Sequence, residues 1–403
     1  MPYNIADSRR DIEDLVVRQA EVFREKQDIN LLTGYCVNDI NPAGQTVQGI
    51  SLNGDEFVFP YDKLLIATGA SPIVPDKPGF DLPGVMVLKT LEDGRRIKAY
   101  LKANTVQKAI IIGMGYIALE MVEALRALNI EVDMVKPRPV FLPWLAEQLS
   151  QAVRDEVESK GVKLYLGHTF EKIEKADKKL RLVCTDTTLE GDMVLVAIGV
   201  TPNSEVAARA GLTLGPGDSI GVSKGLQTSA ENIFAAGDCA DAYHVLTDQK
   251  VWVPLALRAN RAGWAVADNA CGDSTQLPGI AGTAVFKVFD QGVARTGFNQ
   301  KEAAKAGFDP AAVTIKSGSR AHAHPGSSTI WVHMTGDKAS GRLLGVQMVG
   351  KEGVAHRINA PAVALHGHMT VEQFSQSDLA YAPPFGPTWD PMLTAANQLK
   401  KIM

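Results

Sequence analysis

A glycine-rich turn at residues 113–118, with the sequence GMGYIA, constrains the fold of this chain more than any other segment. The pattern predicts an apolar strand before it at 109–112, a helix after it at 116–128 and a second strand at 131–135. This order of elements is a βαβ unit, and parallel strands of that kind normally carry helices on the faces of their sheet. The sequence therefore predicts an α/β fold.

The same turn predicts a dinucleotide site at the start of the helix. Gly113 permits the tight turn, Gly115 lets the backbone approach a pyrophosphate, and the small Ala118 lets helix and strand pack closely. The helix start at Tyr116 and Ile117 then presents unpaired N–H groups to the phosphate charge. A glycine-rich turn without a ligand is the alternative.

Two basic residues, Lys136 and Arg138, follow the second strand of this unit. A site for NAD usually has an acidic residue there, which binds the 2′-hydroxyl of the ribose. Basic side chains suit a 2′-phosphate instead, so the pair favours NADPH, or at least no strict preference for NADH. The alternative is that both residues are solvated on a loop.

Further elements are expected on both sides of this unit. Before it, the patterns predict a helix at 12–26 and strands at 29–32, 47–52, 57–59 and 64–67. After it, they predict helices at 145–160 and 254–270, a hairpin around 172–181, and strands at 163–166, 193–198 and 233–236. Residues 281–403 predict an α+β module with an antiparallel sheet, built from strands near 284–290, 293–298, 312–317, 329–335 and 343–349 and helices near 355–366 and 371–376.

Composition excludes several classes of protein. The 403 residues are enough for two or three domains, and 41 Lys and Arg against 45 Asp and Glu leave a formal charge of −4. This balance argues against a nucleic-acid-coating or basic membrane-surface protein. Without an apolar leader or a run long enough to cross a membrane, we expect a cytoplasmic protein with no membrane partner. The chain has four cysteines, none close to another in sequence: Cys36, Cys184, Cys239 and Cys271. They predict neither a disulfide framework nor a zinc site.

A second nucleotide signature lies at residues 228–238, with the sequence TSAENIFAAGD. It ends in Gly237 and Asp238, and it resembles the motif with which two-dinucleotide-binding flavoproteins hold the ribityl chain of FAD. The alternative for the aspartate is an N-cap of the following segment. Two strand ends, ATG at 67–69 and AIGVTPN at 197–203, resemble the places where the chain of those flavoproteins crosses between domains.

Together these segments resemble the pyridine nucleotide–disulfide oxidoreductases, and more narrowly their single-cysteine branch. That branch contains coenzyme A-disulfide, persulfide and polysulfide reductases, NADH oxidases and NADH peroxidases. The resemblance implies two nucleotide-binding three-layer domains of the FAD/NAD(P)-binding type and a C-terminal α+β dimerisation domain. Its expected boundaries are 1–105 with 225–274 for FAD, 106–224 for NAD(P), and 275–403 for the homodimer contact. FAD and NAD(P)H are the implied cofactors.

The resemblance also assigns expected roles to individual residues. Tyr116 matches the aromatic residue between nicotinamide and flavin, and Glu120 matches the acid near the nicotinamide. The helix start at Leu255 and Ala256 would direct its positive end at the flavin. Residues at the two crossings and in the C-terminal segment, which reaches the partner's flavin and reactive sulfur, complete the implied site: Thr68, Gly69, Gly199, Tyr381 and Phe385.

The match has two departures. The family begins with its own glycine-rich βαβ unit, and no such unit is expected before residue 67 here. The family also carries one redox cysteine, which is followed by Gly, then Leu or Met, then Pro-Tyr. Residues 1–3 (MPY) match the last three of these positions. By that alignment, the chain starts two residues after the redox cysteine. Where coenzyme A-disulfide reductases have a Tyr-Tyr-Pro-Gly run, this chain has residues 323–326, AHPG. His324 could supply acid–base chemistry at neutral pH, and an exposed loop is the alternative; a metal held by His322 and His324 would lack enough ligands.

The sequence therefore predicts an FAD-dependent NAD(P)H oxidoreductase that reduces a disulfide, persulfide or polysulfide, such as a coenzyme A derivative. Tyr381 and His324 are its expected catalytic residues. Two alternatives stay open: an NADH oxidase or peroxidase, and a shortened, non-catalytic dimer that binds nucleotide.

Overall fold

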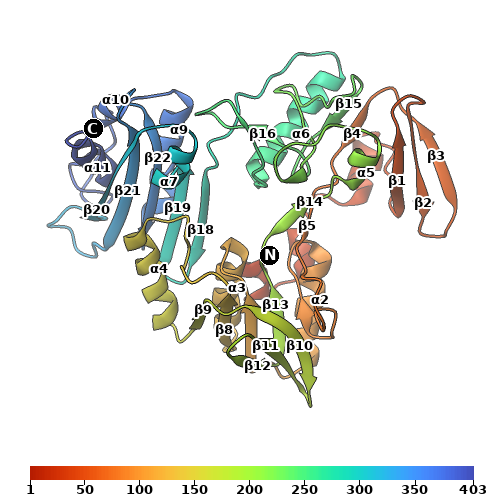
Figure 1. The fold of residues 1–403 in the computed structure, drawn as a ribbon, viewed down its shortest axis with the longest axis horizontal. Coiled ribbons are helices and arrows are strands. Elements are labelled where there is room, and N and C mark those ends of the chain that lie inside the picture. Colours follow the sequence, from red (N-terminus) through yellow and green to blue (C-terminus); the bar gives the residue numbers. More distant parts are fainter. The chain divides into compact units, whose positions relative to one another are not determined.

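The computed structural model describes residues 1–403, and in it the chain forms two compact units from interleaved segments (Figure 1). The first unit joins residues 1–10, 72–199 and 281–403, and the second joins 11–71 and 200–280. The chain passes between the units after residues 71 and 199, close to the two expected crossings. The boundaries of three domains expected from the sequence stay a prediction.

The first unit contains a parallel sheet around the βαβ segment. Its strands, in spatial order, are β6 (Val85–Met86), β13 (Met193–Val196), β7 (Lys108–Ile112), β8 (Glu131–Lys136) and β9 (Lys163–Leu166). The central strand β7 is apolar because both of its faces are covered: Ile111 points into one core and Ile110 into another, and both are fully buried.

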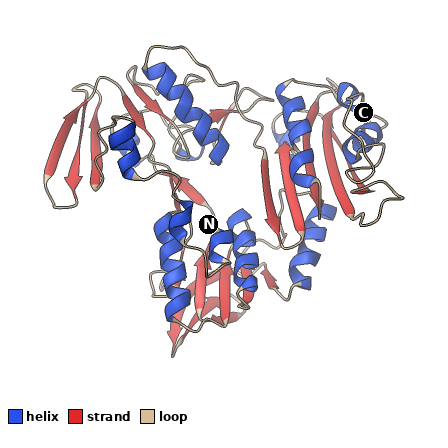
Figure 2. Ribbon diagram, turned by 180° about the vertical axis from the view of Figure 1, so that it is seen from behind, coloured by secondary structure: helices blue, strands red, loops and turns tan.

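Helices cover one face of this sheet and an antiparallel sheet covers the other, which gives three layers (Figure 2). The helices are α2 (Leu91–Ala103), α3 (Tyr116–Ala127) and α4 (Glu147–Ser159), with the short α1 (Pro2–Ile5) beside α2 and α3. The antiparallel strands are β10 (Phe170–Ala176), β11 (Lys179–Cys184) and β12 (Thr188–Gly191). The expected hairpin at 172–181 is present, and it packs on the parallel sheet through Ile173 and Leu182.

The C-terminal part of the first unit is a five-stranded antiparallel sheet. Its spatial order is β18 (Ala284–Val288), β19 (Gln291–Gly297), β22 (Leu343–Gly350), β21 (Thr329–Asp337) and β20 (Pro310–Gly318). Its helices are α7 (Gln300–Lys305), α8 (Val354–Arg357), α9 (Asn359–His366), α10 (Val371–Ser375) and α11 (Pro391–Leu399). Phe286 and Val349 of this sheet belong to the same core as α3 and α4, so the unit has one continuous interior.

The second unit is built on two short parallel strands, β4 (Leu64–Ile66) and β15 (Ile233–Ala235), which share a core with α6 (Ala256–Ala270). An antiparallel sheet of β1 (Tyr35–Asn41), β2 (Thr46–Ser51) and β3 (Glu56–Pro60) belongs to the same unit. The remaining elements are short: β14 (Val200–Pro202), α5 (Glu205–Arg209), η3 (Pro216–Asp218), β16 (Ala242–Tyr243) and β17 (Lys250–Val251). Strand β5 (Ala70–Pro72), at the end of the segment 11–71, pairs with β14.

The mixed α/β class with a C-terminal α+β module is confirmed, but two expected elements, a helix and a strand near the start of the chain, are wrong. The helix expected at 12–26 is two isolated turns, η1 (Ile12–Leu15) and η2 (Val22–Lys26), because only Ile12 of its apolar face is buried and a short helix needs packing to form. The strand expected at 29–32 is absent, and β1 begins at Tyr35 instead. No helix is both long and apolar enough to cross a membrane.

Candidate functional site

The glycine-rich turn lies at the carboxyl edge of the parallel sheet, between β7 and α3. The N–H of Gly113 donates to the carbonyl oxygen of Val135 at 2.9 Å, and the N–H of Ala197 donates to that of Ile112 at 2.8 Å. The backbone of Gly113 has φ +115°, and a Cβ added there would lie 2.2 Å from the oxygen of Ala197. Only glycine fits this position, because the turn is strained for other residues and packed against its neighbour.

Gly115 plays a different part, because it is the N-cap of α3 and no side chain caps that helix. The first intrahelical bond comes from the N–H of Leu119, so the amides of Tyr116, Ile117 and Ala118 have no helical partner. A Cβ added to Gly115 would meet nothing within 4 Å. The turn therefore leaves open space in front of unpaired N–H groups at a positive helix end, which suits a phosphate.

The ring of Tyr116 lies among aromatic side chains that join the parallel sheet to the C-terminal sheet. Its centroid is 4.9 Å from that of Phe286 and 5.3 Å from that of Trp144. Burial raises the pKa of the Tyr116 hydroxyl, so it stays protonated at neutral pH. One helical turn later, Glu120 is half-buried and burial raises the pKa of its carboxyl group.

Tyr3 of α1 contacts this acid directly, and sequence reasoning did not single it out as a site residue. Its hydroxyl donates to Oε1 of Glu120 at 3.1 Å. Burial, together with the Glu120 charge, raises the pKa of Tyr3 to about 12. A phenol with such a pKa keeps its proton across the physiological range, and it therefore acts as a hydrogen-bond donor to the carboxylate.

The two basic residues after β8 differ in their surroundings. Nζ of Lys136 donates to the carbonyl oxygen of Val140 at 3.0 Å, and burial lowers the pKa of its ammonium group. Arg138 is exposed and makes no hydrogen bond or ion pair. Of the two, Arg138 is therefore the side chain available to an incoming phosphate, whereas Lys136 closes the loop that carries it.

A second carboxyl edge, in the other unit, brings the two flavin-type motifs together. Strands β4 and β15 are parallel, and the N–H of Ala236 donates to the oxygen of Ile66 at 3.1 Å. Because both strands end there, Thr68 and Gly69 lie beside Gly237 and Asp238, although some 170 residues separate the pairs in sequence.

Two polar side chains that sequence reasoning did not assign hold this edge in place. The side-chain Nδ2 of Asn203 donates to the carbonyl oxygen of Thr68 at 2.8 Å, and its backbone N–H donates to that of Gly69 at 2.9 Å. Arg258, in the first turn of α6, donates to the carbonyl oxygens of Gly237 and Asp241. Arg258 therefore ties the Gly237 loop to the helix start at Leu255 and Ala256, which no side chain caps. The sequence carried one signal for the role of Arg258: an arginine in the first turn of a helix is unusual, because its positive charge opposes the helix dipole.

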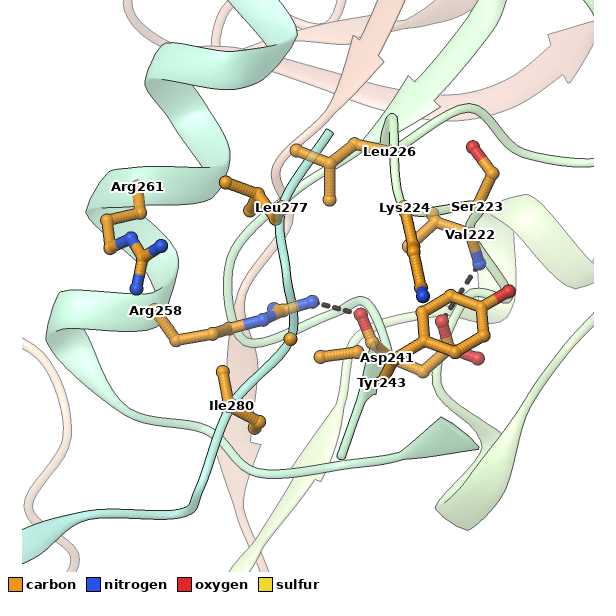
Figure 3. A pocket seen from close by; sticks show the side chains of 12 residues that line it. Val222, Ser223, Lys224, Leu226, Asp241, Tyr243, Arg258, Arg261, Leu277 and Ile280 are labelled. Carbon is orange, nitrogen blue, oxygen red and sulfur yellow. Dashed lines mark hydrogen bonds between the residues drawn. The ribbon is translucent and has the colours of Figure 1, made fainter. Parts of the chain in front are cut away.

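Arg258 also lines a small pocket of about 30 Å³, and no residue expected from the sequence lines it (Figure 3). Asp241 on its wall is fully buried and accepts a hydrogen bond from the N–H of Val222 at 2.9 Å. Nζ of Lys250 lies 3.1 Å from Oδ2 of the same aspartate. These contacts anchor the loop that follows Asp238.

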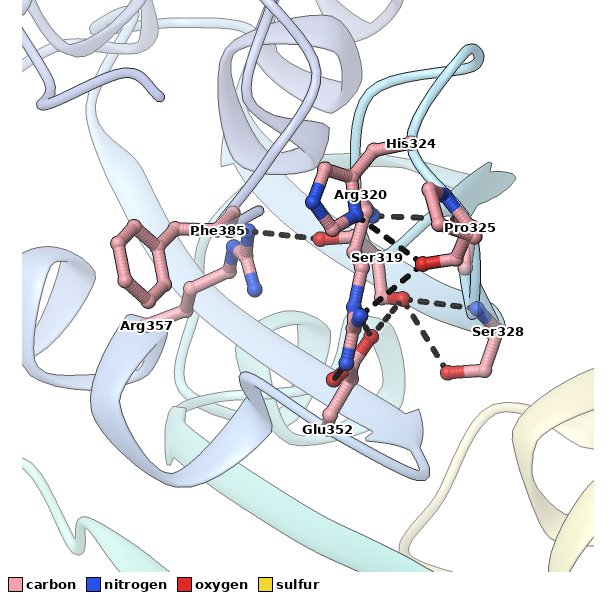
Figure 4. A network of polar contacts seen from close by, with 9 residues as sticks. Ser319, Arg320, His324, Pro325, Ser328, Glu352, Arg357 and Phe385 are labelled. Carbon is pink, nitrogen blue, oxygen red and sulfur yellow. Dashed lines mark hydrogen bonds and ion pairs between the residues drawn. The ribbon is translucent and has the colours of Figure 1, made fainter. Parts of the chain in front are cut away.

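The expected catalytic residues lie in the C-terminal part of the first unit. His324 is partly exposed in the loop between β20 and β21, and its Nδ1 is 3.0 Å from the oxygen of Pro325 (Figure 4). Tyr381 and Phe385 are exposed, at 50% and 77%, in the segment before α11. The N–H of Ala321 donates to the oxygen of Pro383 at 3.0 Å, which joins the loop to that segment.

None of the four cysteines forms a disulfide. Cys184 and Cys239 are buried, whereas Cys36 and Cys271 are exposed. Burial raises the pKa of Cys184 to about 11, which leaves it a thiol at neutral pH. The thiol of Cys239 lies 3.2 Å from the oxygen of Ala236 and packs in the core of the second unit.

Comparisons with known proteins agree with this arrangement. The model of the family described as "Pyridine nucleotide-disulphide oxidoreductase" matches residues 1–267, and the model of its dimerisation domain matches residues 283–392. The NAD(P)H sulfur oxidoreductase (CoA-dependent) of Pyrococcus furiosus is 34% identical over 389 residues, 96% of this chain and 87% of that protein. The NADH oxidase of Methanocaldococcus jannaschii is 31% identical over 404 residues, 100% of this chain and 90% of that protein. A solved NAD-dependent persulfide reductase from A. fulgidus superposes with a TM-score of 0.95 at 35% identity, covering 100% of this chain and 75% of that one.

Two nucleotide-type carboxyl edges and a C-terminal antiparallel module define a dinucleotide-dependent oxidoreductase. The chain belongs to the pyridine nucleotide-disulphide oxidoreductase family, as the resemblance predicted. It is an enzyme that uses FAD and NAD(P)H. The residues present fit both groups, because each carboxyl edge faces an uncapped helix start, α3 in one unit and α6 in the other.

Proposed function

We propose that this enzyme uses NAD(P)H to reduce a sulfur–sulfur bond in a disulfide, persulfide or polysulfide, such as a coenzyme A derivative. The observation that carries the proposal is the similarity, over 96% of the chain, to a protein named NAD(P)H sulfur oxidoreductase (CoA-dependent). For a disulfide, the balanced reaction converts NAD(P)H, one proton and RSSR′ into NAD(P)⁺, RSH and R′SH. FAD, when bound, supplies the redox chemistry between nicotinamide and sulfur.

The chain's own residues have separate roles in this proposal. Gly113, Gly115 and the amides of Tyr116 and Ile117 would hold the pyrophosphate of NAD(P)H, and the space in front of Gly115 supports that role. Tyr116 would shield the nicotinamide from water, and Glu120 would orient it. Residues at the second edge would hold FAD: Thr68, Gly69, Gly237, Asp238, Leu255 and Ala256. Gly199, at the crossing, would line the nucleotide site.

Acid–base chemistry on the sulfur would come from the C-terminal part of the chain. His324 and Tyr381 would donate a proton to the leaving thiolate, and Phe385 would pack beside the flavin of a second subunit. Hydrogen bonding between the two segments supports this grouping, because the N–H of Ala321 bonds Pro383. The proposal includes a homodimer formed through residues 275–403, consistent with the match to the dimerisation domain.

The nucleotide preference in this proposal is for NADPH. Arg138 supports it, since this exposed guanidinium has no protein partner at the end of β8, where the ribose of a dinucleotide lies. Lys136 would contribute by closing the loop rather than by direct contact, because its ammonium group bonds Val140.

The test is an anaerobic assay of NAD(P)H oxidation with coenzyme A disulfide, a persulfide and polysulfide as separate acceptors. Two thiols released per NAD(P)H consumed with the disulfide support the proposal. A second candidate, an oxidase that uses oxygen, is favoured by the similarity to the Methanocaldococcus protein named NADH oxidase. Fast oxygen consumption with no thiol release from any sulfur acceptor would replace the first candidate with the second.

A further inference from the structure

One polar network holds the two segments that carry the proposed acid–base residues. Because it concerns those residues, the inference rests on the proposed function. The first is the loop 319–328, which contains His324, and the second is the segment 381–390, which contains Tyr381. Both are irregular and partly exposed, so neither has a strand or helix to fix it. Their positions depend on Glu352, in the turn between β22 and α8, and on Arg357, the last residue of α8 (Figure 4).

Glu352 fixes the loop through Arg320. Its Oε1 lies 2.8 Å from Nε of Arg320, and its Oε2 lies 2.9 Å from a terminal nitrogen of the same guanidinium. The hydroxyl of Ser319 also donates to Oε1, at 2.5 Å. A two-point pair of this kind fixes the plane of the guanidinium, and not only its distance.

The oriented guanidinium of Arg320 and the imidazole of His324 meet at one carbonyl oxygen, that of Pro325. Its other terminal nitrogen donates to the carbonyl oxygen of Pro325 at 3.0 Å, and Nδ1 of His324 lies 3.0 Å from the same oxygen. Because a carbonyl only accepts, Nδ1 must carry the hydrogen of the neutral ring. Nε2 is then the nitrogen that can take up and deliver a proton, and its direction depends on where Pro325 is held.

Arg357, at the end of α8, ties the second segment to the loop. Its guanidinium donates to the carbonyl oxygen of Phe385 at 2.6 Å, pairs with Asp390 at 2.8 Å, and reaches the oxygen of Ser319 at 3.4 Å. The side chains of Arg357 and Asp390 are only 11% and 13% exposed, so solvent screens this pair weakly. One arginine thus contacts both the loop and the segment.

We propose that Glu352 and Arg357 are positioning residues for the sulfur half of the reaction. Glu352 directs Nε2 of His324 through Arg320 and Pro325, and Arg357 keeps the Tyr381 segment in register with it. Neither residue touches nucleotide in this proposal. Their loss should slow proton delivery to the thiolate while the reaction of NAD(P)H proceeds unchanged.

The experiment compares Glu352→Gln, Arg357→Met and the conservative Arg357→Lys with a control, Arg342→Met. Arg342 lies in the turn at the opposite end of β21 and β22. The expected result is at least a tenfold lower kcat with the sulfur acceptor for Glu352→Gln and Arg357→Met, with KM for NAD(P)H within twofold. Turnover with ferricyanide should also stay within twofold, and Arg357→Lys should recover part of the loss.

Hydrogen exchange supplies a readout that needs no sulfur activity. Glu352→Gln should speed amide exchange at 319–328 at least tenfold, Arg357→Met should do so at 381–390 as well, and the control should do neither. Unchanged exchange, or faster exchange with unchanged kcat, would overturn the positioning role. If the wild-type enzyme reduces no sulfur acceptor, the proposed function fails, and exchange alone decides whether the network holds the two segments.

Discussion

Asn203 and Thr68 hold each other through two hydrogen bonds that run in opposite directions. Nδ2 of Asn203 donates to the carbonyl oxygen of Thr68 at 2.8 Å, and the Thr68 hydroxyl donates to the carbonyl oxygen of Asn203 at 2.5 Å. Oδ1 of the same asparagine accepts from the hydroxyl of Ser71 at 2.8 Å. One side chain therefore determines the shape of the loop that ends β4, at the edge proposed to hold FAD.

Replacing Asn203 by Ala should weaken FAD binding. The change removes two side-chain hydrogen bonds, and a loss of about 1.4 kcal/mol would weaken binding tenfold. Fluorescence of released flavin, titrated against protein concentration, measures the dissociation constant. Asn260→Ala is the matched control, because Asn260 bonds only the oxygen of Ala256 on the surface of α6. Equal flavin affinity in the two variants would contradict this role for Asn203.

Alanine substitutions at the two glycines of the β7–α3 turn should have opposite effects: one should lower the stability of the fold, and the other should weaken nucleotide binding. Gly113→Ala should destabilise the fold by about 2 kcal/mol or more, because the new Cβ would collide with Ala197 in a backbone conformation unfavourable for alanine. Gly115→Ala should leave the unfolding free energy within about 0.5 kcal/mol of the wild type, since its Cβ meets no protein atom.

The binding measurements should show the reverse order. The Cβ of Gly115→Ala would occupy the space proposed for the pyrophosphate, so NAD(P)H should bind at least tenfold more weakly. Thermal unfolding and titration of NAD(P)H fluorescence give the two quantities for each variant. Normal nucleotide binding by Gly115→Ala would show that the pyrophosphate lies elsewhere.

The local parts of this site could be predicted from the sequence, but its supports could not. The turn at 113–118 and the helix after it are contiguous, so spacing alone placed Gly113 and Gly115 at a helix start. Asn203 acts on a loop 135 residues earlier in the chain, and no periodic pattern records such a contact.

In two places, the local sequence carried a helix signal that did not lead to a correct prediction: at α2 and at residues 12–26. Thr90 and Asp93 form a capping box that marks the start of α2, an unexpected helix. Residues 12–26 have a helical apolar pattern, yet most of that face stays partly or fully exposed and the helix does not form. Pattern predicts a helix only where another surface covers its apolar face.

Replacing Arg138 by Ala should change the nucleotide preference. A charged hydrogen bond to a 2′-phosphate contributes about 1.5–3 kcal/mol, so KM for NADPH should rise roughly 10- to 100-fold while that for NADH stays unchanged. Steady-state kinetics with both nucleotides check this. Arg154→Ala is the control, since Arg154 pairs with Glu158 on the exposed face of α4. An equal rise for both nucleotides would place Arg138 outside the 2′ site.

Replacing Tyr3 by Phe should move the titration of Glu120 to higher pH. The hydroxyl of Tyr3 stabilises the carboxylate, so its removal raises the pKa of a group that burial already raises. In a pH profile of kcat/KM for NAD(P)H, the acidic limb assigned to Glu120 should shift upward in Tyr3→Phe and disappear in Glu120→Gln. Tyr100→Phe, which loses a bond to the oxygen of Asp192, should leave that limb in place.

His333 should make the protein less stable as the pH falls from 6.5 to 4. Burial in β21 lowers its pKa from 6.5 to about 4, and its Nδ1 pairs with the hydroxyl of Thr314 at 2.9 Å. In this window the unfolded chain binds a proton that the folded chain does not, so unfolding is favoured by up to about 3 kcal/mol. The loss should begin near pH 6.5 and level off below pH 4, because both states are then protonated.

Urea unfolding at a series of pH values tests this dependence, with His333→Asn as the variant. The Asn amide can replace Nδ1 as the partner of Thr314, but it does not titrate. The variant is expected to be less stable at every pH because it leaves a space in the sheet, so the slope with pH is the readout. Between pH 6.5 and 4 the wild type should lose about 3 kcal/mol more than the variant. Parallel curves for the two proteins would show that His333 takes up its proton in the folded sheet as readily as in the unfolded chain.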